Sequence, residues 1–152
     1  MDMQKRRRFI EKIEGLVQEL TLPIVPMDDF FDGNTDDRSM GRGMQTSRDI
    51  PIREYHEVFR SIRDQPDVQE ILVLINEVPD DRFAADRETW PQAHVVVVLT
   101  SVPAAEVAKW IEQLEPRWAG EGWCYPDLAG WKQPLSEFDL LPGMRPVCVE
   151  LL

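Results

Sequence analysis

The chain has 152 residues, of which 43% are hydrophobic, and its 28 acidic and 17 basic residues give a formal net charge of −11. This size and apolar content suit one domain with its own core, so we expect a single domain over residues 1–152. Because the net charge repels nucleic-acid phosphates and anionic lipid, both are disfavoured as partners. A basic protein or peptide is the partner that such a field would attract.

The cysteines and the N-terminus favour a cytoplasmic location. Cys124 and Cys148 are too few for a disulfide framework, and Cys148 lies in an apolar run typical of a buried strand. The basic residues 5–8 are followed by an amphipathic, acid-containing segment rather than by the apolar core of a signal peptide. No stretch approaches the roughly 20 apolar residues that span a bilayer.

Residues 1–20 predict an amphipathic helix. Apolar side chains recur there at the three-to-four spacing of one helical face, at Phe9, Ile10, Ile13, Leu16, Val17 and Leu20. The basic run 5–8 lies at the positive end of the helix dipole, which is unfavourable. We therefore expect it to be either solvated or neutralised by another group.

Residues 22–26 predict a short strand at a sheet edge, because proline cannot donate to an interior ladder. Residues 27–50 follow as a long loop that is dense in Asp, Gly, Ser and Arg and shows no sustained period. Loops of more than about 15 residues inside a compact domain are usually functional or disordered. We therefore expect a site in this segment.

The rest of the chain alternates between helix and strand patterns. Tyr55, Val58, Phe59 and Ile62 indicate a helix, and the apolar runs 70–78 and 94–100 indicate strands covered on both faces. Further elements are a helix over 107–114, a second long loop over 118–143 and a last strand over 145–151.

After the first helix this order is β-α-β-β-α-β, which is typical of a ferredoxin-like sandwich. The sequence therefore predicts an α+β fold. Consecutive strands usually neighbour one another, so we expect 70–78 to lie beside 94–100, with at least two helices against one face of the sheet.

The segment from Phe30 to Asp37 joins an aromatic pair to a Gly/Asn turn rich in oxygen side chains. Asp32, Asn34 and Asp36 alternate as do the first ligands of a calcium loop, but the pattern fails further on, where Asp37 replaces the required Gly. We therefore expect an Asx-turn held by side-chain to backbone hydrogen bonds, with no metal and no cofactor.

Other catalytic and metal-binding templates are incomplete. His56 and His94 have no metal-ligand spacing with either cysteine, and no nucleophile elbow or phosphate loop is present. A second cluster, Trp118, Trp123, Tyr125 and Trp131, predicts either buried packing or an exposed aromatic patch with an acidic rim. The sequence thus favours a protein that is not an enzyme.

Several short runs resemble a family of uncharacterised bacterial proteins of similar size with a Phe-Phe-Asp/Glu-Gly-Asn-x-Asp motif. They are Leu22-Pro23-Ile24-Val25, Phe30-Phe31-Asp32-Gly33-Asn34 with Asp36 and Ser39, Pro66-Asp67-Val68-Gln69, Val98-Leu99-Thr100-Ser101 and Gly120-Glu121-Gly122-Trp123. Residues 40–44 depart from the Gly-Cys-Asn type of sequence in that family, so a site built on such a cysteine would be absent. The resemblance implies no function.

We interpret the chain as a non-catalytic acidic binding protein, and the more specific form of this hypothesis is an immunity-type neutraliser of a basic toxin. The predicted binding residues are Phe31, Asp36, Asp37, Glu121 and Trp123. One alternative is a hydrolase or metal-dependent enzyme that uses Asp32, Asp36 and Asp37. Another is a structural or regulatory domain. The oligomeric state is not predicted.

Overall fold

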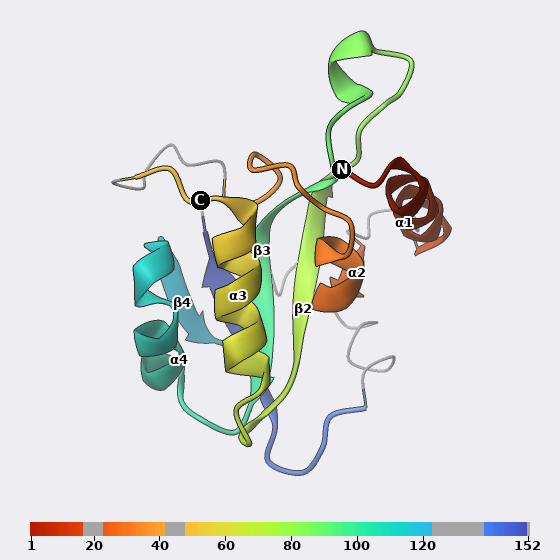
Figure 1. The fold of residues 1–152 in the computed structure, drawn as a ribbon. Helices are drawn as coiled ribbons and strands as arrows, with labels where there is room; N and C mark the ends of the chain where they lie inside the picture. The colour runs from red at the N-terminus through yellow and green to blue at the C-terminus, as the bar shows by residue number, and fades with distance from the viewer. Residues whose placement is uncertain (17–22, 42–47, 123–138, 152) are drawn as a thin grey trace.

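The structure, a computed structural model, describes residues 1–16, 23–41, 48–122 and 139–151. These residues form one antiparallel sheet whose five strands lie in the order β1-β2-β3-β5-β4 (Figure 1). The strands are β1 (Ile24–Pro26), β2 (Val68–Glu77), β3 (Gln92–Thr100), β4 (Trp118–Glu121) and β5 (Arg145–Glu150). The predicted pairing of the two apolar runs is confirmed by the contact of β2 with β3.

The described residues also form four α-helices, α1 (Met3–Leu16), α2 (Met27–Phe31), α3 (Ile52–Arg63) and α4 (Ala104–Trp110), and two short 3-10 helices, η1 (Ala84–Asp86) and η2 (Glu112–Leu114). In Figure 1, α2, α3 and α4 lie over the same face of the sheet. The predicted α+β class with an N-terminal helix is confirmed.

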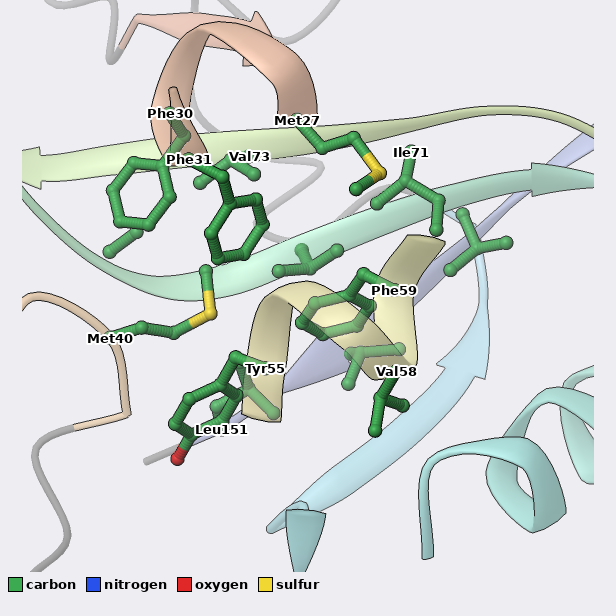
Figure 2. Packing of buried hydrophobic residues seen from close by; sticks show 14 of the residues in the cluster. Met27, Phe30, Phe31, Met40, Tyr55, Val58, Phe59, Ile71, Val73 and Leu151 are labelled. Carbon is green, nitrogen blue, oxygen red and sulfur yellow. The ribbon is translucent and has the colours of Figure 1, made fainter. Parts of the chain in front are cut away.

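The larger part of the core fills the space between this face and the helices. Figure 2 shows Phe30 and Phe31 of α2 and Phe59 of α3 among the side chains of β2 and β3. In β3 the consecutive valines divide between the two faces, because Val96 and Val98 join this cluster while neighbouring valines join the cluster on the other face. Continuous apolar runs are expected of strands buried on both faces.

Cys148 belongs to the cluster on the other face and is disulfide-bonded. The cysteines therefore give less support to a reducing compartment than their number suggests, and the cytoplasmic location stays a prediction. Among the described residues, no helix has the length and apolar content needed to cross a membrane.

The ferredoxin-like sandwich is not confirmed. That fold places its first strand in the sheet interior, whereas β1 lies at the edge and pairs with β2 alone. Strands β1, β2 and β3 lie side by side in the order in which they occur in the chain. Strand β5, rather than β4, then pairs with β3. The edge position of the 22–26 strand is as predicted, and it accommodates Pro26, which has no backbone N–H to donate.

The two long loops were predicted too broadly. Helix α2 lies inside 27–50, because Met27, Phe30 and Phe31 share one helical face and bury it, while Asp28 and Asp29 in the first turn suit the helix dipole. Strand β4 lies inside 118–143, where pairing with β5 rather than local apolar alternation defines the strand. Parts of both predicted loops, residues 42–47 and 123–138, lie outside the described residues.

Basic side chains of α1, among them Lys5 and Arg6 of the run 5–8, pair with acidic side chains from elsewhere in the fold. Lys5 pairs with Asp32 at 2.6 Å, and Lys12 pairs with Asp29. Arg6 is 3% exposed and pairs with Asp81 at 2.7 Å. Since exposed ion pairs contribute little and buried charges need partners, Arg6 is the residue of the three on which the docking of α1 most depends.

Phe59→Ala is expected to lower the free energy of unfolding by about 3 to 5 kcal/mol, because Phe59 is fully buried and its removal leaves a cavity. Phe83→Ala is the matched control, since Phe83 is 62% exposed and its loss should change stability by less than about 0.5 kcal/mol. Urea unfolding of both variants measures the difference. Equal effects would contradict the placement of the core.

Candidate functional site

The loop that follows α2 is held by its own side chains. Asn34 Oδ1 accepts a hydrogen bond from Asp36 N at 2.9 Å, and Asp36 Oδ1 accepts one from Arg38 N at 3.0 Å. Asn34 Nδ2 donates to Ser39 Oγ at 2.9 Å, and Ser39 Oγ donates to the Asp36 carbonyl at 2.7 Å. Three of these contacts join a side chain to the backbone two or three residues away, as predicted for this loop, and the contact of Asn34 with Ser39 joins two side chains.

The same loop connects distant parts of the fold. Asp36 Oδ2 accepts from the backbone N–H of Trp90 at 3.0 Å, and Asp37 Oδ1 accepts from the N–H of Ile52, the first residue of α3, at 2.9 Å. Helix N-termini leave backbone N–H groups without intrahelical partners, so Asp37 acts as a cap supplied from outside the helix. The loop therefore fixes the start of α3 relative to the chain that leads into β3.

A cavity of about 1060 Å³ lies beside this loop. It is bounded by the loop itself, the start of α3, the end of β2 and the chain that leads into β3. The lining residues are Asp37, Arg38, Met40, Asp49, Ile50, Pro51, Tyr55, Glu77, Pro79, Ala85, Asp86, Thr89, Trp90 and Gln92. This volume is at the upper end of the range for small-molecule and cofactor sites, roughly 300 to 1,000 Å³.

The charge of the cavity lining is predominantly negative. Four carboxylate side chains line it, those of Asp37, Asp49, Glu77 and Asp86, against one basic side chain, that of Arg38. The remaining lining includes apolar and aromatic side chains from several elements. An apolar wall with a few charged groups is the usual form of a ligand site, and here the charge favours a cation.

Two of the lining residues contain buried polar atoms that have no hydrogen-bond partner. They are Nε1 of Trp90, which is fully buried, and Oε1 of Gln92, which is 8% exposed as a residue. The great majority of buried polar atoms in proteins are paired, so two exceptions that line one cavity need an explanation.

The predicted binding residues have different surroundings. Phe31 is buried and stacks on His56, with ring centroids 4.6 Å apart, and burial lowers the pKa of His56. Asp36 is buried in the loop network described above, whereas Asp37 is exposed and lines the cavity. Glu121 is exposed, and its Oε1 accepts from Ala104 N, at the start of α4, at 3.0 Å.

The structure does not bring Phe31 and Glu121 together. Helix α2 packs on β1 and β2, while Glu121 ends β4 at the opposite edge of the sheet. Trp123 lies outside the described residues. The binding role of the five predicted residues is therefore still a prediction, and Asp37 is the member of the set that lines the cavity.

Of the predicted tryptophan cluster, Trp118 is described and the others are not. Its side chain is half exposed and lies against Gly120, where a Cβ atom would come within 2.1 Å of the indole. A side chain at position 120 would therefore require the indole of Trp118 to move. Trp123, Tyr125 and Trp131 lie outside the described residues.

The chain is similar to one described protein family. A model of the uncharacterised YfbO protein family matches residues 4–149. The chain belongs to this family. No curated protein and no solved structure matches it. The resemblance to an uncharacterised family is thereby confirmed, while the Phe-Phe-Asp/Glu-Gly-Asn-x-Asp motif as a mark of that family stays a prediction.

The carboxylates on which the enzyme alternative depends have structural partners in the fold, and that alternative stays a prediction. Asp36 and Asp37 bind backbone N–H groups, and Asp32 pairs with Lys5. These interactions are structural, and each carboxylate is directed toward a different partner. Within the described ranges, no group of three or more His, Cys, Asp or Glu side chains could hold a metal ion.

Several residues of the cavity were not singled out by sequence reasoning. Trp90 and Gln92 lie in the charged connection between the predicted strands 70–78 and 94–100, and Glu77 ends β2. A tryptophan and an amide placed two residues apart at the start of a buried strand were the available signal. Their meeting with Asp37 and Tyr55 depends on tertiary structure.

Asp36→Ala is expected to lower the free energy of unfolding by about 2 kcal/mol, because it leaves the backbone N–H groups of Trp90 and Arg38 without their acceptor. Thr35→Ala, at an exposed position of the same loop, is the control. Chemical denaturation of both variants measures the cost. A loss below about 0.5 kcal/mol for Asp36→Ala would show that the network is dispensable.

Because Tyr55 is buried, we expect the free energy of unfolding to fall at high pH. Burial, reinforced by the nearby Glu54 carboxylate, raises the pKa of Tyr55 to about 12, whereas an unfolded tyrosine ionises near about 10. As the pH rises, the Tyr55 phenol therefore loses its proton in the unfolded state first. The contribution of the neutral phenol to folding stability is complete below about pH 10 and is lost as the pH rises through about 12.

Between pH 8 and pH 11 the native protein is expected to lose about 1 kcal/mol more stability than Tyr55→Phe, which has no phenol to ionise. Urea unfolding at the two pH values measures this, and other titrating groups cancel in the comparison. Parallel pH profiles for the two proteins would contradict the assignment.

Proposed function

We propose that the protein is a non-catalytic binding protein that holds a basic segment of a protein or peptide partner in the acidic cavity. The observation that carries this proposal is the excess of carboxylates over basic groups in a cavity with apolar walls. The overall charge of −11 adds a long-range field that would steer a basic partner toward the protein.

The shape of the cavity favours a partner that inserts a side chain into it over a partner that binds a flat surface. Asp37 and Asp49 are exposed at the cavity, and beneath them the buried residues Met40, Tyr55 and Trp90 form apolar lining. A lysine or arginine side chain suits this gradient, because its aliphatic stem packs on apolar groups while its charged head stays near carboxylates. An immunity-type neutraliser of a basic toxin is the most specific form of this proposal.

An arginine hexapeptide is the simplest probe of the proposal. We expect it to bind with an affinity that falls as salt concentration rises, while a glutamate hexapeptide does not bind. The double variant Asp37→Asn/Asp49→Asn keeps the shapes of both side chains and an acceptor for Ile52 N. It should weaken binding about fivefold at low ionic strength, since two surface charges contribute about 1 kcal/mol.

The matched control is Glu11→Gln/Asp64→Asn, which removes the same net charge at exposed positions that do not line the cavity. Fluorescence anisotropy of a labelled peptide measures all three proteins. Equal weakening by the two double variants would mean that the peptide responds to net charge alone, and the cavity would then not be the binding site.

A further inference from the structure

The two unpartnered polar atoms of the cavity are complementary in kind. Trp90 Nε1 is a donor and Gln92 Oε1 is an acceptor, and the two residues are two positions apart where the chain passes into β3. Leaving such atoms buried and unpaired costs about 1 to 3 kcal/mol each. A ligand that offers an acceptor to one and a donor to the other would remove both penalties.

Trp90 is held rigidly in its position. Its ring stacks on Phe9 with centroids 5.5 Å apart and planes inclined by 23°, and its backbone N–H is bound by Asp36. Since stacking restrains the ring and a hydrogen bond restrains the backbone, the indole can donate to a ligand with little further loss of conformational freedom. The carboxylates of Asp37 and Asp49 line the same cavity.

This donor and acceptor pair distinguishes between classes of ligand. A carboxylate offers acceptors alone and is repelled by the acidic lining, and a simple cation offers donors alone and leaves Trp90 unpaired. A secondary amide offers a carbonyl oxygen and an N–H in one planar group. The cavity therefore matches an amide that is joined to a cation.

Both atoms are covered in the structure, so a ligand reaches them when a neighbouring side chain moves. Met40 lines the cavity and forms a β-bridge with Ala93, the residue after Gln92. Methionine is unbranched and changes rotamer readily, which makes it suited to uncovering such a position.

We propose that the cavity recognises one lysine or arginine residue of a peptide together with its backbone amide. The amide carbonyl accepts from Trp90 Nε1, the amide N–H donates to Gln92 Oε1, and the cationic side chain lies against the cavity carboxylates. This inference rests on the proposed function, because the carboxylates attract the peptide and the buried pair selects the amide.

Two small probes separate these contributions. Nα-acetyl-arginine methylamide carries an amide and a guanidinium group, whereas propylguanidine carries the guanidinium group alone. We expect the native protein to bind the first about tenfold more tightly, because propylguanidine has no acceptor for Trp90 Nε1. Binding of the amide probe should also shift the indole N–H resonance of Trp90 in ¹⁵N spectra, and Trp90→Phe assigns this resonance.

Gln92→Met removes the acceptor at nearly constant volume and is the second variant. It should reduce the preference for the amide probe to below about threefold, because the amide N–H then loses Gln92 Oε1 as its acceptor. Equal affinity of the native protein for both probes, or no shift of the Trp90 indole resonance at saturation, would overturn the amide inference while leaving the proposed function standing. If Asp37→Asn/Asp49→Asn binds the arginine hexapeptide as the native protein does, the proposed function itself fails.

Discussion

The geometry of the candidate site depends on how Asp36 distributes its two carboxylate oxygens. One oxygen accepts from Arg38 N and closes the loop on itself, and the other accepts from Trp90 N and ties the loop to the start of β3. Gly33, with φ of 81°, supports this arrangement, because a Cβ there would come within 2.9 Å of the Lys5 side chain. With Asp37 capping α3, one short turn positions two walls of the cavity.

Arg6 holds the chain between β2 and β3, part of which lines the cavity, and it shares the Thr89–Trp90 peptide unit with Asp36. Its guanidinium donates to the Thr89 carbonyl at 2.7 Å and to the Asp86 carbonyl at 3.0 Å, in addition to its pair with Asp81. These bonds fasten the excursion between β2 and β3, which projects beyond the end of the sheet in Figure 1, to α1. A buried arginine is costly unless its donors are used, and here carbonyls and a carboxylate use them.

The parts of the fold that could be predicted from sequence are those in which local pattern and burial agree. The runs that form β2 and β3 are apolar on both faces, so their burial follows from the pattern, and their pairing follows from their being consecutive strands. Helix α2 is too short to show a period, and β4 exists because β5 pairs with it. Strand order is a tertiary property, which is why the β-α-β-β-α-β order did not yield the observed sheet.

The candidate site was only partly predictable for the same reason. Asp36 and Phe31 look like surface chemistry in the sequence, yet the fold uses one as a hydrogen-bond acceptor for backbone and the other as a core side chain. Conversely, Trp90 and Gln92 have no motif, and the role proposed for them is suggested only by the burial of atoms that lack partners. Asp37 is the predicted residue that lines the cavity, and its carboxylate both accepts from Ile52 N and is exposed there, so its binding role stays a prediction.

The unpaired atoms of Trp90 and Gln92 also bear on the balance between stability and function. A domain is stable by roughly 5 to 15 kcal/mol, so two unsatisfied buried groups at about 1 to 3 kcal/mol each form a considerable fraction of that margin. Selection for stability alone would favour apolar side chains of similar shape at both positions, since removing a polar group that has no partner relieves its penalty. In an otherwise regular fold, residues that break the usual rules of packing and hydrogen bonding concentrate at functional sites. Because both departures line the cavity that carries the carboxylates, they support recognition at this site more strongly than the acidic residues do alone.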